Sequence, residues 1–204
     1  EDDGFRRFAT YPREDCRGLC VLNDETIAGA ATLAHTADEG SLRVLVPLAG
    51  SIQYKDDDGN GALVEAGQVL SAFVDRGNKF EIKNTYDDRA VRLLHISLAD
   101  EQHPKSELQI HNFDLNDFQN RLLNIVCRNN HSVWIGKFDG RCEGMLPLRN
   151  NRAFVHVVHG AFEVQNRLLE TGDGLSLWNA SVLEFEALSN EAIIVALEEI
   201  YHAK

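Results

Sequence analysis

Arg152 and His156 are the two side chains in the second half of the sequence whose types and spacing best suit ligand binding. Counted back from Gly160 along an alternating strand, Arg152, Phe154, His156 and Val158 would share the inner face. A guanidinium and an imidazole on that face could bind an anionic or polar molecule. The alternative is structural: His156 donates to a backbone carbonyl, and Arg152 lies at the rim in solvent.

The other histidines outside the first 40 residues form no metal-ligand spacing with one another or with cysteine. We interpret them as surface or packing residues: His95, His103, His111, His131 and His202. The sequence also lacks a G-x-S-x-G elbow, a P-loop and a dinucleotide fingerprint. The familiar motifs of hydrolytic and nucleotide chemistry are therefore missing.

The cysteines are too few and too scattered for a disulfide framework. Cys16 and Cys20 form a C-x3-C pair beside Arg13 and Arg17, which could lower a thiol pKa and favour redox chemistry. The alternative is two reduced thiols near a strand edge.

Charge and hydropathy exclude several kinds of partner. The chain has 20 basic and 32 acidic residues and a formal net charge of −12, so its bulk surface should repel DNA and RNA. No stretch approaches the roughly 20 apolar residues that span a bilayer, and the start of the chain lacks the apolar core of a signal peptide. We expect a cytoplasmic protein without a membrane partner. Because the sequence begins at Glu1 and not at Met, it leaves open whether a leader was removed before Glu1.

Short apolar strands must position these side chains. Runs rich in Val, Ile, Leu and Phe alternate with clusters of Gly, Asn and Asp, which predicts an all-β sandwich or barrel. The predicted strands are Ser41–Leu48, Ser51–Lys55, Val91–Leu98, Arg152–Val158, Ala161–Gln165 and Ala192–Leu197. Asp114–Val126 fits either a helix or a connector.

An internal repeat indicates two domains. Residues 44–54 (VLVPLAGSIQY) and 154–164 (FVHVVHGAFEV) each run through an apolar strand to a glycine and into an alternating strand. A second glycine then precedes another apolar strand in each copy. The simplest account is two homologous barrels, at residues 1–98 and 121–204, joined by a linker at 99–120. Exposed strand edges would suit either a monomer or a homodimer.

Specific motifs make the sequence similar to the pirin-like bicupin family of the cupin superfamily. Val21-Leu22-Asn23-Asp24, Gly50 and the Asp56–Asn60 turn fall at that family's spacing without gaps. Residues 169–187 (LETGDGLSLWNASVLEFEA) resemble the second barrel of the family. The resemblance covers nearly the whole chain and implies two tandem jelly-roll barrels, each a double-stranded β-helix.

The family resemblance also implies a metal site. Pirin-like proteins hold one divalent metal, usually iron, through three His and one Glu of the first barrel. Some degrade quercetin with dioxygen, and the eukaryotic protein acts as a nuclear cofactor of transcription regulators. Such chemistry needs imidazole and carboxylate ligands with open coordination positions.

The family metal positions are substituted here. At the ungapped spacing they fall on Thr36, Asp38, Phe80 and Ile82. Phe80 and Ile82 share parity, so we expect both to point into the barrel and pack there. His35 is one residue out of register, and a bulge could turn it inward to form a pair with Asp38.

Two functional hypotheses follow. The first is a metal-free bicupin without a cofactor, which binds a small apolar or aromatic molecule or acts as a regulatory or interaction protein and not as an enzyme. Its pocket residues would be His35, Asp38, Phe80, Arg152 and His156. The second is a divergent metal-dependent dioxygenase of the quercetin 2,3-dioxygenase type, which would need iron or another divalent metal.

Overall fold

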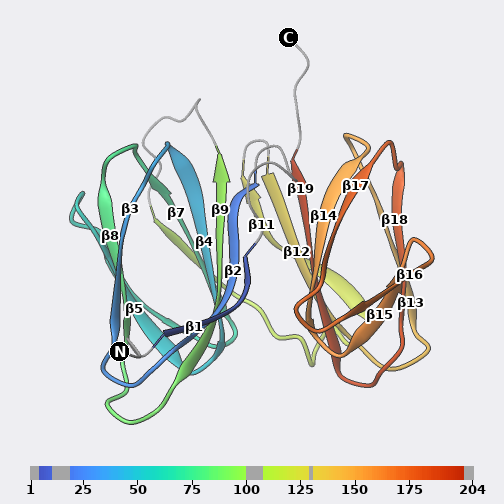
Figure 1. Ribbon diagram of the computed structural model, residues 1–204, viewed down its shortest axis with the longest axis horizontal. Coiled ribbons are helices and arrows are strands. Elements are labelled where there is room, and N and C mark those ends of the chain that lie inside the picture. The colour runs from blue at the N-terminus through green and yellow to red at the C-terminus, as the bar shows by residue number, and fades with distance from the viewer. Residues whose placement is uncertain (1–4, 11–18, 100–107, 129–130, 200–204) are drawn as a thin grey trace. The chain divides into compact units, whose positions relative to one another are not determined.

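The computed structural model describes residues 5–10, 19–99, 108–128 and 131–199, and every regular element in them is a β-strand (Figure 1). The predicted all-β class is confirmed. The chain divides into two compact units, Glu1–Phe113 and Asp114–Lys204. No helix that could cross a membrane occurs in the described ranges. The redox prediction depends on Cys16, which lies outside them.

The first unit is built from two antiparallel sheets. Its strands are β1 (Phe5–Thr10), β2 (Leu19–Ile27), β3 (Thr32–Thr36), β4 (Ser41–Ala49), β5 (Ser51–Asp56), β6 (Gly61–Glu65), β7 (Gln68–Val74), β8 (Lys79–Asn84), β9 (Val91–Ala99) and β10 (Gln109–Asn112). One sheet has the order β1-β2-β9-β4-β7-β10, and the other has the order β3-β8-β5-β6. Apolar side chains from both sheets meet in a common core.

Strand β8 shows how the sequence sets this arrangement. In KFEIKN, Phe80, Ile82 and Asn84 are buried, while the three charged residues between them are exposed. This period of two matches a sheet with one face in the core and one in solvent. Phe80 and Ile82 therefore lie inside the barrel.

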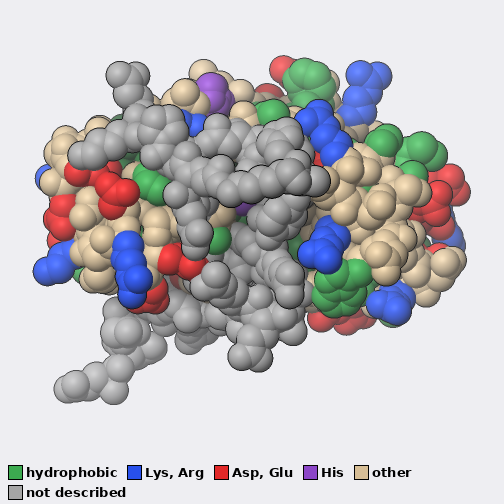
Figure 2. All heavy atoms as spheres, turned by 90° about the horizontal axis from the view of Figure 1, so that it is seen from above, with side chains coloured by type: hydrophobic (Ala, Val, Ile, Leu, Met, Phe, Trp, Pro, Cys, Tyr) green, Lys and Arg blue, Asp and Glu red, His purple; other side chains and the backbone are tan. Residues whose placement is uncertain are grey.

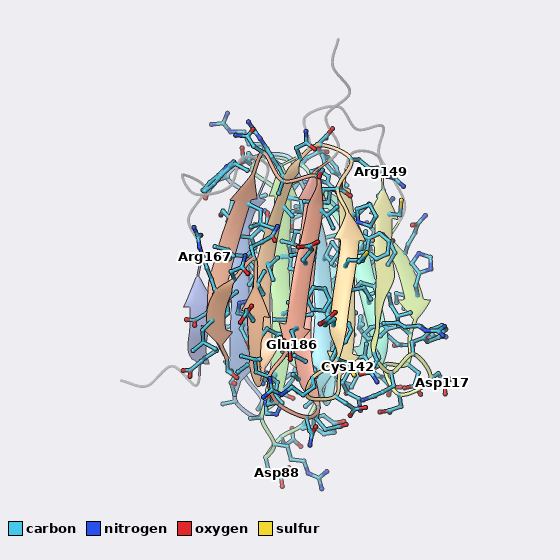
Figure 3. All side chains as sticks on the ribbon, turned by 90° about the vertical axis from the view of Figure 1, so that its right-hand side faces the viewer. Asp88, Asp117, Cys142, Arg149, Arg167 and Glu186 are labelled. Atoms are coloured by element: carbon cyan, nitrogen blue, oxygen red, sulfur yellow. The ribbon has the colours of Figure 1, made fainter. Side chains whose placement is uncertain are left out.

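The second unit repeats the two-sheet plan. Its strands are β11 (Arg121–Arg128), β12 (His131–Phe138), β13 (Glu143–Pro147), β14 (Arg152–His159), β15 (Ala161–Val164), β16 (Arg167–Glu170), β17 (Gly174–Trp178), β18 (Val182–Ala187) and β19 (Ala192–Glu199). The sheets have the orders β11-β12-β19-β14-β17 and β13-β18-β15-β16. Figure 3 looks toward the smaller sheet, with Arg167 on β16 and Glu186 on β18 labelled. Apolar residues of both sheets form the core of this unit.

Gly50 and Gly160 occupy equivalent turns of the two units and have the same backbone conformation. Their φ angles are +82° and +81°, in the left-handed region that favours glycine. A Cβ at Gly50 would lie 2.8 Å from Val91 Cγ2, and one at Gly160 would lie 2.9 Å from Ala192 Cβ. The glycine repeated in the sequence thus meets the same two requirements in both units: a positive φ and no room for a Cβ atom.

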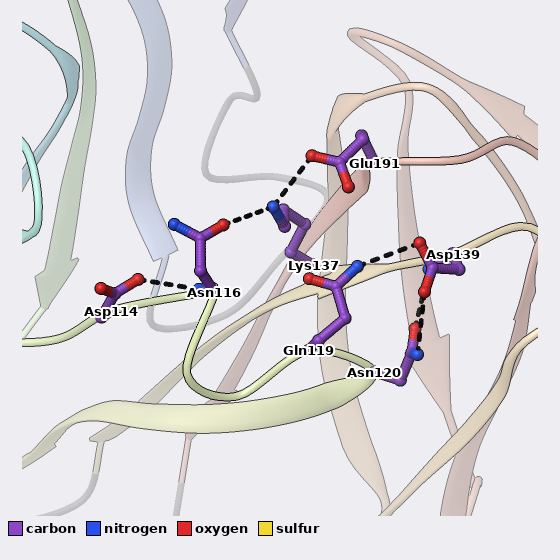
Figure 4. A network of polar contacts seen from close by, with 7 residues as sticks. All are labelled: Asp114, Asn116, Gln119, Asn120, Lys137, Asp139 and Glu191. Atoms are coloured by element: carbon purple, nitrogen blue, oxygen red, sulfur yellow. Dashed lines mark hydrogen bonds and ion pairs between the residues drawn. The ribbon is translucent and has the colours of Figure 1, made fainter.

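The segment that opens the second unit is not helical. Residues 115–120 form turns, and β11 follows them. Asn116 donates its backbone N–H to Asp114 Oδ1 at 2.8 Å, and Lys137 Nζ donates to Asn116 Oδ1 at 2.6 Å (Figure 4). Asn120 Nδ2 donates to Asp139 Oδ2 at 3.2 Å. Local bonds of Asn and Asp side chains compete with a helix, which explains why the helical interpretation fails.

Candidate functional site

Strand β3 with the turn after it, and strand β8, carry the four positions that the family resemblance assigns to metal ligands. These strands pair antiparallel, with His35 opposite Phe80 and Thr36 opposite Lys79. Phe80 and Ile82 are 1% and 0% exposed and belong to the core, as their parity predicts.

Two of the expected positions, Thr36 and Asp38, do not face the barrel interior. Thr36 and Asp38 are exposed, whereas Ala37 is buried in the core and the ring of His35 packs on Phe80. Strand alternation therefore makes His35 and Ala37 the inward pair, and His35 needs no bulge to reach the interior. Asp38 is too exposed to pair with it inside the barrel.

Four side chains surround Phe80, and together with it they form what we call the ring cluster: His35, Arg43, Tyr54, Phe80 and His95. The rings of His35 and Phe80 are stacked, with centroids 4.9 Å apart and planes 18° apart. His95 meets Phe80 edge-on at 5.7 Å and His35 at 5.1 Å. Arg43 Cζ lies 5.0 Å from the Phe80 centroid, and the Tyr54 ring lies 6.1 Å away. The Phe80 ring thus has all four other members of the ring cluster as close neighbours.

Strand alternation aims the polar members of the ring cluster inward. Arg43 shares a face of β4 with the core residue Leu45, and His95 shares a face of β9 with the core residue Leu93. Arg43 and His95 are both buried. The sequence interpretation missed Arg43 and treated His95 as one packing residue among several. No alternation in the sequence marks them, because both faces of β4 and β9 are largely buried.

A buried carboxyl group also lies on the inner face of β2. Glu25 is fully buried and shares its strand face with the core residue Ile27. Buried charges are costly unless they are compensated, so the Glu25 carboxyl is a further polar group that the interior of this barrel must accommodate.

In the barrel interior the Arg43 cation lies above the face of the Phe80 ring, and the neutral form of the Tyr54 phenol is favoured. The Arg43 guanidinium lies within the distance at which the face of an aromatic ring attracts a cation. Burial, followed by the nearby Asp56 carboxylate, raises the pKa of Tyr54 above its ordinary value. Tyr54 donates its hydroxyl to Asp56 Oδ2 at 3.2 Å.

The residues at the family metal positions do not fit a metal with three His and one Glu. At the inward positions of these two motifs, only His35 has a donor atom for a metal, because Ala37, Phe80 and Ile82 have none. Across the described ranges, no group of three or more His, Cys, Asp or Glu side chains is placed to hold a metal ion. The ring cluster is a packed aromatic and cationic site.

The inner face of β14 differs from the sequence prediction. Val155 and Val157 lie in the core of the second barrel, and Arg152 is exposed. The pairing of β14 with β19 shifts register between Val157 and His159, so counting back from Gly160 crosses a bulge that inverts the parity. Arg152 and His156 therefore do not line the barrel interior.

His156 is buried on the opposite face of β14. Its Nδ1 lies 3.2 Å from the carbonyl oxygen of Asp173. This contact and the exposed Arg152 correspond to the structural alternative, not to an anion site. Leu183 and Phe185, which repeat the positions of Phe80 and Ile82, are buried in the second core.

Comparisons with known proteins agree with this architecture. Residues 119–196 match the family model described as the quercetinase C-terminal cupin domain. The protein YhaK from Escherichia coli has a similar structure, with a TM-score of 0.80 and 19% identity over 97% of this chain and 93% of that one. The nickel(II) complex of the bacterial pirin YhhW from Escherichia coli gives 0.75 and 16%, over 97% and 92%.

A quercetin 2,3-dioxygenase from Acinetobacter baumannii gives a TM-score of 0.71 and 15% identity, over 97% of this chain and 81% of that one. No curated protein matches the sequence significantly. The two-sheet units and these matches define a cupin fold in tandem. The second unit thus matches a quercetinase-type cupin family model, and the whole chain has the fold of these cupin structures.

Proposed function

We propose that this pirin-like protein works without a metal, as a binding protein of the regulatory or interaction type and not as a dioxygenase. The observation that carries the proposal is the ring cluster: Phe80 stands at a family ligand position, and its ring is covered by His35, Arg43 and His95.

Two physical arguments support the absence of a metal. An aromatic ring and a branched aliphatic side chain, at Phe80 and Ile82, replace two ligands and fill the space that the ligands would enclose. The Arg43 guanidinium is charged at every physiological pH, and a second cation beside it in a poorly solvated interior is repelled.

Metal analysis of the purified protein tests the proposal. The protein would be produced in medium supplemented with iron, nickel and manganese and measured by inductively coupled plasma mass spectrometry. We expect substoichiometric metal, and no rise in melting temperature when nickel is added, because a ligand that binds only the native state stabilises it. Stoichiometric metal, or dioxygen-dependent loss of quercetin, would overturn the proposal.

The second candidate function is that of a divergent dioxygenase. It is favoured by the structural similarity to a quercetin 2,3-dioxygenase and by a group of polar side chains in the first barrel. The His35 and His95 rings lie 5.1 Å apart inside one barrel, and Glu25 is buried on an inward strand face. A metal would have to recruit these side chains in place of the family positions. If metal is found, His35→Ala and His95→Ala should each remove it, whereas Thr36→Ala should not.

A further inference from the structure

The outer face of the smaller sheet of the second unit concentrates carboxylates in one row. Glu143 on β13 pairs with Glu186 on β18, and Glu186 pairs in turn with Glu163 on β15. Glu184 lies on the same face, opposite Met145. Like charges directly opposite each other across strands destabilise a sheet. The fold therefore accepts a cost at this face.

Nearby basic charge compensates the row only weakly. Arg141 Nη1 lies 3.3 Å from Glu186 Oε1, but the Arg141 side chain is 84% exposed. An exposed ion pair of this kind contributes little to stability. The negative potential of the row thus stays available to a partner.

The same face is hollowed and carries exposed apolar side chains. A groove of about 530 Å³ is lined by the four glutamates together with Met145, Gln165 and Asn166. Met145 is 70% exposed, and Leu168, which pairs with Glu163 from the far side, is 63% exposed. Figure 3 shows Glu186 on this face. We call the groove with Leu168 the acidic groove.

The first barrel shows that the fold does not require this charge. Aligning Gly50 with Gly160 places Gln53 at the position of Glu163, and aligning Phe80 with Leu183 places Lys83 at the position of Glu186. Both first-barrel residues are exposed on the corresponding sheet. The concentration of carboxylate is therefore a property of the second barrel alone.

We infer that the acidic groove docks a basic, extended peptide segment of a partner protein, with Lys or Arg side chains on the glutamate row and an apolar side chain against Met145 and Leu168. Charge complementarity selects this occupant. The glutamates of the row follow one another at the strand spacing of about 4.8 Å, and alternate side chains of an extended peptide repeat at about 6.8 Å. Flexible lysine side chains can bridge that difference. The inference rests on the proposed function in assigning the protein a binding role, and metal analysis tests that role separately.

Peptide binding tests the inference on the full chain. The probe is a fluorescein-labelled octapeptide in which every second residue is Lys or Leu, with Ser between them, so that Lys and Leu share one face of the extended chain. The reference peptide has Glu in place of every Lys. We expect fluorescence anisotropy to show binding of the Lys peptide that weakens as salt rises, and no binding of the Glu peptide. Equal binding of both peptides, or of neither, would refute the inference.

A matched pair of variants locates the binding surface. Glu163→Gln with Glu186→Lys transfers the first-barrel residues into the groove and changes the net charge by +3. Asp87→Asn with Asp88→Lys makes the same change at an exposed turn of the first unit. We expect the groove variant to lose at least about tenfold in affinity, equivalent to roughly 1.4 kcal/mol, and the turn variant to lose much less. Equal losses would show that only net charge matters and would overturn the inference.

Two further measurements keep the test decisive. If the double variant does not fold by circular dichroism, Glu143→Gln and Met145→Ser each replace one exposed side chain of the groove and should each weaken binding a few-fold. Sedimentation velocity examines self-association. If the wild-type chain forms an oligomer that the groove variants dissociate, the occupant is a second copy of the chain, and the assignment to a basic partner peptide is wrong.

Discussion

Phe80 contacts side chains that come from four other strands. His35 belongs to β3, Arg43 to β4, Tyr54 to β5 and His95 to β9. A side chain shared by so many strands ties both sheets of the first barrel together. Its loss leaves a cavity beside the buried Arg43 guanidinium.

Replacing Phe80 with alanine should therefore lower the free energy of unfolding by about 3–5 kcal/mol. The measurement is a urea melt followed by tryptophan fluorescence. Glu81→Ala, on the exposed face of the same strand, is the matched control and should change stability by no more than about 0.5 kcal/mol. A small effect of Phe80→Ala would mean that the ring cluster does not carry the core.

Tyr54 gives the barrel a pH dependence at alkaline pH. Its pKa in the folded protein is raised by burial and by Asp56, whereas in the unfolded chain it is about 10. Above that pH the unfolded chain loses the phenolic proton while the folded protein keeps it, so the unfolded state binds fewer protons. Stability then falls as pH rises, by at most about 1.4 kcal/mol per pH unit.

Urea melts at a series of pH values above neutrality would measure this fall. Tyr54→Phe should flatten it, because phenylalanine has no proton to lose. Tyr86→Phe leaves Tyr54 in place and should retain the fall. The explanation fails if the two variants have the same alkaline profile.

Single residues of the site were predictable only where strand parity was secure. Phe80 and Ile82 follow a clean alternation in KFEIKN, and the structure buries both. Thr36 and Asp38 were placed by ungapped spacing, and one residue of drift exchanges the inward and outward faces of a strand. Arg43 and His95 lie in runs so apolar that their own direction was hidden, since both faces of β4 and β9 are largely buried.

At the scale of elements, the repeat and its glycines were readable, but the bulges were not. The predicted strands correspond to β4, β5, β9, β14, β15 and β19. Register shifts occur at Pro47–Ala49 in β4 and at Val157–His159 in β14, the same place in both repeats. A bulge adds one residue without a composition signal, so parity counted across it is inverted. This is why Arg152 and His156 were assigned to the wrong face.

Gly160, between β14 and β15, and Gly172, between β16 and β17, allow backbone strain to be separated from crowding by neighbouring atoms. Both have a positive φ, but a Cβ at Gly160 would press on Ser189 and Ala192, whereas one at Gly172 would meet no heavy atom within 4 Å. Gly172→Ala should cost only the left-handed backbone strain of about 1–2 kcal/mol. Gly160→Ala should cost roughly 1–3 kcal/mol more, because packed neighbours must move. Thermal or urea melts of the two variants give the difference directly, and equal losses would show that the close approach is relieved freely.

At the scale of the whole molecule, net charge limits what the protein can bind. The chain carries −12 at neutral pH, with a sequence pI of about 5.0. On the face seen in Figure 2, Lys and Arg side chains are interspersed with Asp and Glu. Nucleic-acid binding depends on a surface that replaces the counterions of many phosphates, and interspersed charge of this sign does not supply one.

The protein should therefore leave duplex DNA unshifted in a gel assay even at low salt, near 50 mM, where electrostatic binding is strongest. A basic protein of similar mass would serve as the positive control on the same gel. The same preparation should be retained by an anion exchanger at neutral pH and lose solubility as the pH approaches the pI. A DNA complex whose affinity falls steeply with added salt would contradict this prediction. A steep salt dependence means that basic side chains neutralise several phosphates, and the net charge gives no indication of such a basic surface.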